Sequence, residues 1–210
     1  MNTGSGYLLI VEDDPDILKL LQTTLTFKGY RVVTARNGRE GLDLVRADRP
    51  AIVIADIMMP KLDGFGLVHR LRLDPQTCDI PVVFITATYV APEDKEFALN
   101  IGATRFLQKP VDLDAFLKTI QELLHSNNLP LAIEPMHELK FYEGYRHRLE
   151  IKLDQKIKQI ARDELLLKTR PDLDSESLQA SLRHAIEERQ EIMLLLEQVR
   201  EQAEKFSRNE

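Results

Sequence analysis

The chain has 210 residues, a length that fits one or two domains and suffices to bury a core without disulfides or structural metals. Charged residues make up 30% and hydrophobic residues 43%, as in an ordered, soluble protein. The net charge of -6 disfavours a protein whose whole surface binds nucleic acid. The single cysteine, Cys78, excludes an internal disulfide framework, and the apolar residues 7–11 are too few for a signal peptide or a membrane span, so we expect a cytoplasmic protein.

Glycine and proline divide the chain into two regions. Of the nine glycines and ten prolines, only Gly144 and Pro171 lie beyond residue 135. Residues 126–130 are a polar cluster that ends in proline, which indicates a loop. We therefore expect a first domain over residues 1–128, a linker over residues 129–138 and a helical region over residues 139–210.

Within the first region, apolar runs alternate with stretches of helical spacing. We expect strands at residues 7–11, 31–35, 51–56, 81–86 and 104–107. The first helix is indicated by Ile17, Leu21 and Leu25 on one face, and by a cap followed by proline at Asp14 and Pro15. Five strands that alternate with five helices predict an α/β fold, a doubly wound parallel sheet covered by helices on both faces.

Polar side chains follow the strands at their carboxyl ends, where open parallel sheets bind ligands. Three consecutive acids, residues 12–14, follow the first strand, and Asp56 ends the third. Thr86 ends the fourth strand, and Lys109 follows the fifth. Clustered carboxylates favour a hard cation such as Mg²⁺, which would neutralise incoming phosphoryl oxygens. Asp56 is then the candidate nucleophile that attacks phosphorus, while Thr86 and Lys109 contact the phosphoryl oxygens.

Four short motifs carry a resemblance to a known family. They are residues 11–15 (Val-Glu-Asp-Asp-Pro), 56–64 (Asp-Ile-Met-Met-Pro-Lys-Leu-Asp-Gly), 85–87 (Ile-Thr-Ala) and 109–110 (Lys-Pro). With these motifs in this order and spacing, residues 6–126 resemble the receiver domain of two-component response regulators, the chemotaxis-type receivers included. The resemblance implies a five-stranded sheet with the flavodoxin-like strand order.

The resemblance also implies a role for each reactive position. Asp56 matches the phosphorylated aspartate. Asp14 matches the acid that ligates Mg²⁺ directly, and Asp13 matches the acid that acts largely through water. The backbone carbonyl of Met58 matches a further metal ligand, so Mg²⁺ is the implied cofactor.

Two further positions match the part of the family that senses phosphorylation. Thr86 and Lys109 match the pair that contacts the phosphoryl group, and Phe106 matches the switch aromatic that turns inward when Thr86 moves toward the phosphate. The bond from Lys109 to Pro110 matches one that is commonly cis in the family. The implied donor is a sensor histidine kinase or a phosphotransfer protein. The implied chemistry is self-phosphorylation and slow self-hydrolysis, with no turnover of an external metabolite.

The second region predicts two long helices, residues 139–168 and 178–206, separated near Pro171. The second helix carries an apolar heptad row, Leu178, Ala185, Ile192, Val199 and Phe206. Such a row must be buried, either in an antiparallel helical hairpin or in a coiled coil or four-helix bundle of two chains. We expect a homodimer through this region.

The helical region shows no zinc spacing, phosphate loop or turn-glycine helix-turn-helix, so we expect it to bind a protein partner and no membrane. Two alternatives stay open. The first is nucleic-acid binding in the manner of receiver-linked antiterminator domains, against which residues 178–206 hold six Asp/Glu and four Lys/Arg. The second is transfer or removal of phosphate through His147 or His184, although neither histidine is followed by the acid and proline typical of histidine kinases.

Overall fold

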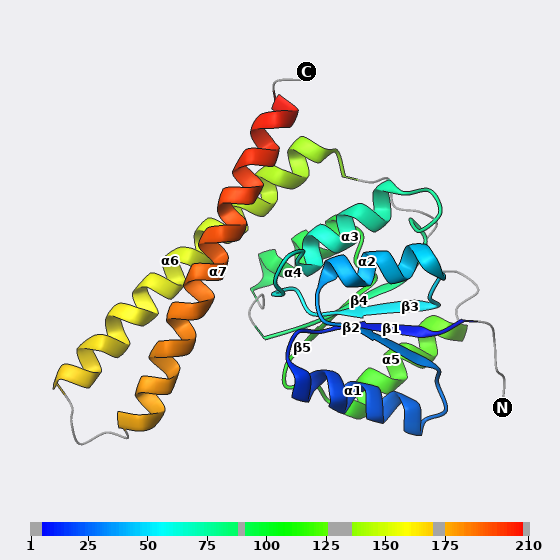
Figure 1. Cartoon of the computed structure of the whole chain (residues 1–210), viewed down its shortest axis with the longest axis horizontal. Helices are drawn as coiled ribbons and strands as arrows, with labels where there is room; N and C mark the ends of the chain where they lie inside the picture. Colours follow the sequence, from blue (N-terminus) through cyan, green and yellow to red (C-terminus); the bar gives the residue numbers. More distant parts are fainter. Residues whose placement is uncertain (1–5, 88–90, 126–135, 170–174, 208–210) are drawn as a thin grey trace. The chain divides into compact units, whose positions relative to one another are not determined.

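The computed structural model describes residues 6–87, 91–125, 136–169 and 175–207, and the chain forms two compact units, Met1–Met136 and His137–Glu210. The first unit alternates strands and helices, and the second consists of two long helices (Figure 1). The predicted loop at residues 126–130 and most of the predicted linker at residues 129–138 lie outside the described residues.

A five-stranded parallel sheet forms the centre of the first unit, with the strand order β2-β1-β3-β4-β5. The strands are β1 (Leu8–Val11), β2 (Val32–Ala35), β3 (Ile52–Ala55), β4 (Val82–Thr86) and β5 (Arg105–Gln108). The helices between and after them are α1 (Pro15–Phe27), α2 (Gly38–Ala47), α3 (Gly64–Leu73), α4 (Pro92–Asn100) and α5 (Leu113–His125). This arrangement confirms the predicted doubly wound α/β fold with the flavodoxin-like strand order.

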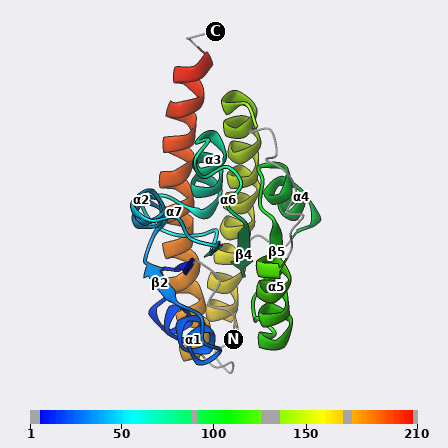
Figure 2. The ribbon, with the colours of Figure 1, turned by 90° about the vertical axis from the view of Figure 1, so that its right-hand side faces the viewer.

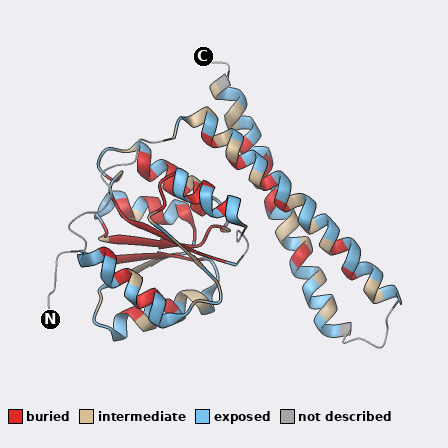
Figure 3. Cartoon of the chain, turned by 180° about the vertical axis from the view of Figure 1, so that it is seen from behind, coloured by how far each residue is buried: buried red, intermediate tan, exposed pale blue. Residues whose placement is uncertain are grey.

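Helices cover the sheet on both faces, with α1 and α5 on one side and α2, α3 and α4 on the other (Figure 2). Alternate strand residues such as Ile10 and Ile54 pack with Phe116 of α5 in the first core. In the second core, Phe65 of α3 makes edge-to-face ring contacts with Phe84 of β4, at 5.7 Å between ring centroids, and with Phe97 of α4, at 5.2 Å. Strands β1, β3 and β4 are buried at every position (Figure 3), which explains their continuous apolar sequences.

Short polar side chains fix where three of these helices begin. Asp14 caps α1, Asn37 caps α2 and Asp63 caps α3, each by accepting a hydrogen bond from a backbone N–H in the first turn. Pro15 occupies the first turn of α1, where its missing N–H costs no hydrogen bond. A cap of this kind typically contributes about 1 kcal/mol, so the sequence sets the helix starts that frame the carboxyl edge of the sheet.

A buried cation joins the amino ends of β4 and β5. The guanidinium of Arg72, at the end of α3, donates to the carbonyl of Gly102 at 2.7 Å and to the carbonyl of Ile80 at 2.9 Å. Nearby, the Thr104 hydroxyl accepts a hydrogen bond from the backbone N–H of Val82 at 3.0 Å. Gly102 has φ 107°, and a Cβ there would lie 2.6 Å from Nε of Arg72, so this contact requires glycine.

The second unit is an antiparallel hairpin of α6 (Glu138–Thr169) and α7 (Ser175–Ser207), which is one of the arrangements that the sequence left open for the two predicted helices. Apolar residues along both helices are buried, among them Leu149 and Ile160 of α6 and Ala185, Ile192 and Val199 of α7. Within the described part of the chain, no helix has the length and apolar character that a membrane crossing requires.

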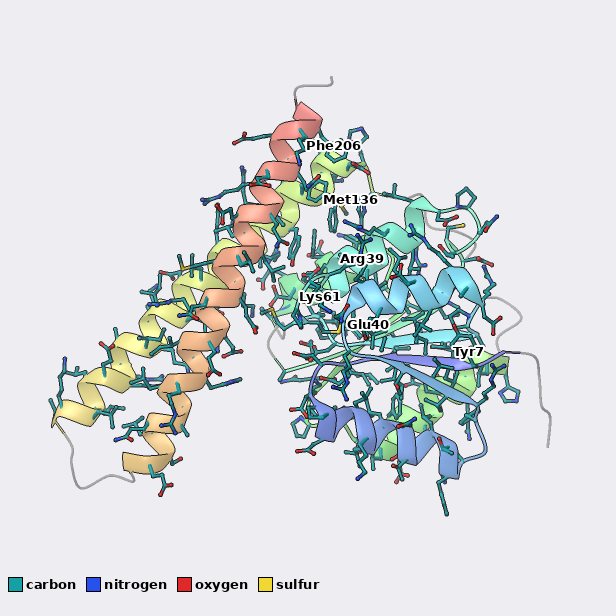
Figure 4. All side chains as sticks on the ribbon, in the orientation of Figure 1. Tyr7, Arg39, Glu40, Lys61, Met136 and Phe206 are labelled. Atoms are coloured by element: carbon teal, nitrogen blue, oxygen red, sulfur yellow. The ribbon has the colours of Figure 1, made fainter. Side chains whose placement is uncertain are left out.

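Polar contacts link the two helices at several levels. The Ser181 hydroxyl lies 3.3 Å from the buried carboxylate of Asp163. Lys156 pairs with Glu188. At the open end of the hairpin, Phe206 of α7 stacks on Tyr142 of α6, with 5.6 Å between ring centroids (Figure 4). These contacts fix the level at which each part of α6 lies beside α7.

Candidate functional site

The carboxyl ends of four strands bring the predicted polar residues to one edge of the sheet. Val11 of β1 lies opposite Ala55 of β3, so Glu12 and Asp56 are the next residues on neighbouring strands. The backbone N–H of Asp56 donates to the carbonyl of Val11 at 2.9 Å, which extends the sheet ladder to Asp56. This register holds Asp56 by strand pairing on a rigid scaffold.

Three carboxylates gather at this edge. Glu12, Asp13 and Asp56 each offer an oxygen, and these oxygens all lie within 4.8 Å of one another. Glu12 and Asp56 are buried, and Asp13 is exposed. Carboxylate oxygens are the ligands that Mg²⁺ prefers in proteins, so the chemistry of this group fits a magnesium ion with one side open to water.

Lys109 is the cation that balances this group. Its ammonium donates to Oδ2 of Asp56 at 2.6 Å and to Oε2 of Glu12 at 2.9 Å. Burial by itself would lower the pKa of Lys109, but the charges of Asp56 and Glu12 outweigh burial and raise that pKa above its ordinary value. The peptide bond from Lys109 to Pro110 is cis, as expected from the resemblance.

Glu12 is harder to ionise than an ordinary glutamate. Burial, reinforced by the negative charge of Asp56, raises the pKa of Glu12 to about 7, although the hydrogen bond from Lys109 opposes the shift. A divalent cation at this edge would favour the ionised form of Glu12, so metal binding is expected to strengthen as the pH rises through neutrality.

Asp14 lies outside the carboxylate group. Its Oδ1 accepts hydrogen bonds from the backbone N–H of Asp16 at 2.8 Å and of Ile17 at 3.1 Å. In the structure, Glu12 joins Asp13 beside Asp56, whereas Asp14, which the resemblance matched to the acid that ligates Mg²⁺ directly, caps α1. The sequence carries a signal for this cap, since an aspartate directly before a proline is a helix-start pattern.

The loop after Asp56 contains Met58, which is half-buried, and is held in place by α2 and α3. The backbone N–H of Gly38, the first residue of α2, donates to the carbonyl of Leu62 at 2.8 Å. A Cβ at Gly64 would lie 2.3 Å from the carbonyl oxygen of Asp56, so only glycine permits α3 to begin this close to Asp56.

An exposed ion pair adds a further link between α2 and this loop. Lys61 and Glu40 lie 3.7 Å apart beside the start of α2 (Figure 4). Glu40 also accepts a hydrogen bond from the side chain of the capping residue Asn37 at 2.6 Å. Because both charges are exposed, this pair positions the loop more than it stabilises the fold.

Thr86 and Phe106 lie on adjacent strands, as predicted. Thr86 is fully buried at the end of β4, and its carbonyl accepts a hydrogen bond from the backbone N–H of Lys109 at 2.9 Å. Phe106 of β5 lies opposite Phe84 and is half-buried. Because side chains alternate along a strand, Thr86 and Phe84 share one sheet face, and Phe106 belongs to the same face.

Comparison with known proteins finds many relatives of the first unit. The family model described as response regulator receiver domain matches residues 8–121. Protein PilH of Pseudomonas aeruginosa is 39% identical over 117 residues, which cover 56% of this chain and 96% of PilH. Response regulator MprA of Mycolicibacterium vanbaalenii is 38% identical over 117 residues, which cover 56% of this chain and 49% of MprA. The chain spans about half the length of several curated relatives that it matches, transcriptional regulators among them.

Solved structures give the same result for the fold. The chemotaxis response regulator CheY4 of Vibrio cholerae is 34% identical with a TM-score of 0.53, covering 57% of this chain and 98% of CheY4. The signal receiver domain of a signal transduction histidine kinase from Syntrophus aciditrophicus is 32% identical with a TM-score of 0.54, covering 61% of this chain and 99% of that domain. With the match at residues 8–121 covering more than half of its residues, the chain belongs to the response regulator receiver domain family.

Proposed function

We propose that Asp56 accepts a phosphoryl group and that the protein is a response regulator of a two-component phosphorelay. The observation that carries the proposal is the position of Asp56. It directly follows the buried strand β3, lies in one carboxylate group with Glu12 and Asp13, and accepts a hydrogen bond from Lys109. An oxygen of Asp56 would attack phosphorus as the bond to the donor breaks, which leaves an acyl phosphate on Asp56.

The metal residues of this proposal follow the geometry. Asp13 and Asp56, with the backbone carbonyl of Met58, would hold Mg²⁺, and Glu12 would act beside them, largely through water. When bound, the ion supplies positive charge to the phosphoryl oxygens. Asp14 keeps its role as the cap of α1.

Lys109 and Thr86 would recognise the phosphoryl group. The Lys109 ammonium already touches the acceptor oxygen, so a small shift brings it to a phosphoryl oxygen as a charge-assisted donor. The Thr86 hydroxyl would donate to another phosphoryl oxygen, and its movement would leave space for Phe106 to turn inward. The donor would be a sensor histidine kinase or a phosphotransfer protein, and the acyl phosphate would hydrolyse slowly on the protein itself.

The helical region would transmit the signal by binding a protein partner in the cytoplasm, as a homodimer. The two-helix hairpin supports this proposal because it offers long surfaces of mixed apolar and charged residues. The curated relatives named as transcriptional regulators match about half of their own length, so their names bear on the receiver alone. We place the receiver at residues 1–128, the linker at residues 129–138 and the output region at residues 139–210.

Incubation with acetyl phosphate and Mg²⁺, followed by intact-mass measurement, tests the acceptor. We expect one added phosphoryl group on the wild type and none on Asp56→Asn. Asp43→Asn, an exposed carboxylate of α2, is the matched control and should label like the wild type. Undiminished labelling of Asp56→Asn would refute the assignment of the acceptor.

A further inference from the structure

The apolar row that the sequence offered for dimerisation is already used inside the chain. Ala185, Ile192 and Val199 are 0–4% exposed and lie on the face that α7 turns toward α6. On α6, Leu149 and Ile160 are buried in the same way. A second chain docking on the hairpin therefore needs a different surface.

A second apolar row lies beside the buried one. On α7, Ile186 and Met193 each follow a buried residue by one position. On α6, Leu153 follows the buried Lys152, and Ile157 follows the half-buried Lys156, which pairs with Glu188 of α7. We name this set, together with Leu182, which precedes Ile186 by four residues, the flank row: Leu153, Ile157, Leu182, Ile186 and Met193. Ile157 is 50% exposed and Met193 is 53% exposed, so part of the flank row faces water.

The flank-row residues of both helices lie on one side of the hairpin. A step of one residue turns a helix by about 100° in the same sense, and two antiparallel helices that face each other carry such residues on the same side. A direct contact supports this geometry. Glu150 follows the buried Leu149, Arg200 follows the buried Val199, and their side chains lie 3.2 Å apart.

The flank-row residues of the two helices also lie at matching levels. The pairs Lys156–Glu188 and Glu150–Arg200 set the alignment of α6 beside α7. When this antiparallel alignment is continued residue by residue, Leu153 lies level with Met193, and Ile157 lies between the levels of Ile186 and Met193. A two-fold axis parallel to the hairpin would therefore place the flank-row residues of α6 in one copy against the flank-row residues of α7 in the other copy, and the reverse.

We propose that the flank row is the surface on which a second copy of this chain docks, so that two hairpins form a four-helix bundle. The inference rests on the homodimer of the proposed function and names its interface. One flank of a hairpin about 45 Å long and about 20 Å wide offers roughly 900 Å², against the roughly 800 Å² per partner of a stable interface. Arg189, whose Nε is buried without a hydrogen-bond partner, lies among these residues and would pack its methylene stem against them.

Charge favours this side of the hairpin over the opposite one. At one end of the flank row, Glu150 pairs with both Arg146 and Arg200, so this group of three charged side chains keeps only one net positive charge. The opposite side of the hairpin has a more polar surface. It carries the residues that come directly before a buried residue, such as Arg162 and His184. Apolar contact between two copies is therefore best served by the flank row.

Analytical ultracentrifugation of the full-length protein tests the interface with two matched double variants. Ile157→Glu/Met193→Glu places charges in the flank row. Leu165→Glu/Leu194→Glu places the same charges at residues that are 60% and 57% exposed but lie two positions beyond a buried residue, on the outward side. We expect a wild-type dimer at tens of micromolar, at least about a hundredfold weaker association in the flank-row variant, and a control that stays dimeric.

Every other pattern overturns the proposal. A monomeric wild type, equal dissociation of both variants, or dissociation of the control alone each excludes the flank row as the interface. Should the flank-row variant lose helical circular dichroism, Ile157→Gln/Met193→Gln replaces it, because glutamine keeps helix propensity, and the same outcomes apply. Labelling of Asp56 in the same samples reports separately on the phosphoacceptor, so the two proposals fail independently.

Discussion

The two units of the chain differ in how their polar and apolar side chains are arranged. In the first unit, a few polar groups at the ends of buried strands are held within hydrogen-bonding distance of one another, as with Lys109 between Asp56 and Glu12. In the second unit, the polar contacts link one helix to the other, and the mixed surface left over includes a row of partly exposed apolar side chains. A chemical site can thus be read from its residues, whereas a docking surface is defined by what the rest of the fold leaves exposed.

The largest expected effect concerns the cation of the carboxylate group. Lys109→Met should lower the free energy of unfolding by about 3 kcal/mol, because it leaves two buried carboxylates without their partner. Burial raises the pKa of Glu12, so ionised Glu12 costs folding energy, and the loss should be greater at about pH 8 than at about pH 5. Urea unfolding at both pH values measures it.

The control for this variant is an exposed lysine from the same edge of the sheet. Lys61→Met breaks only the exposed pair with Glu40 and should cost less than about 0.5 kcal/mol. Added Mg²⁺ should restore part of the stability of Lys109→Met, since it supplies the missing positive charge. Equal losses in the two variants would show that the site behaves electrostatically like ordinary surface.

The second prediction separates Asp13 from Asp14. Asp13→Ala should slow labelling by acetyl phosphate about a hundredfold or more, because it removes a carboxylate from the metal group. Asp14→Ala should label at nearly the wild-type rate while losing about 1 kcal/mol of stability, because it removes the cap of α1. Intact-mass time courses and urea unfolding give both numbers, and a reversal of the two labelling results would restore Asp14 as the metal ligand.

The third prediction concerns the cap of α3. Burial raises the pKa of Asp63 to about 7, and its Oδ2 has no hydrogen-bond partner. Because the folded pKa exceeds the unfolded one, stability contributed by this group falls as the pH rises from about 4 to about 7. Asp63→Asn keeps an acceptor for the N–H of Gly66 and should stabilise the protein by about 1–2 kcal/mol above about pH 7. Thermal unfolding across this range checks it, and a pH-independent effect would contradict it.

The smallest expected effect is the coupling between the two units. Beryllofluoride, a phosphoryl mimic, should change hydrogen-exchange protection about fivefold in α4, β5 and parts of α6, at the low end of usual coupling energies. Thr86→Ala should remove the change, whereas Thr119→Ala, which loses an exposed hydroxyl of α5, should keep it. Changes confined to the first unit, with partner affinity also unmoved in Thr86→Ala, would make the receiver a phosphate sink without output.

The fold of the first unit could be predicted because several levels of sequence agreed. Continuous apolar strands, capped helix starts and polar strand ends all favour one arrangement of parallel strands. The sequence did not decide which two of residues 12–14 lie beside Asp56, because Asp14 satisfied two patterns at once, a cap before Pro15 and a position in a run of acids. Only the direction of its carboxylate, toward the N–H groups of α1, decides between the two.

The second unit shows what periodicity leaves undecided. The row Leu178, Ala185, Ile192, Val199 and Phe206 indicated burial, and its central residues are buried. A heptad row says that something covers it, but a neighbouring helix of the same chain and a helix of another chain satisfy it equally. The sequence could not predict that Ile157 and Met193 are partly exposed, because their exposure depends on which face of each helix the hairpin buries.

Arg72 holds one end of strands β4 and β5 more firmly than the other. Its guanidinium pins the amino ends of β4 and β5 to the end of α3 through the carbonyls of Ile80 and Gly102, whereas the opposite ends of the same strands carry Thr86 and Lys109. A displacement that begins at the carboxyl edge, where phosphorylation is proposed, then acts on strands whose amino ends are held in place. The two strands are therefore expected to tilt about their held amino ends, so that a shift at the carboxyl edge of the sheet also moves the strand ends next to α4 and α5.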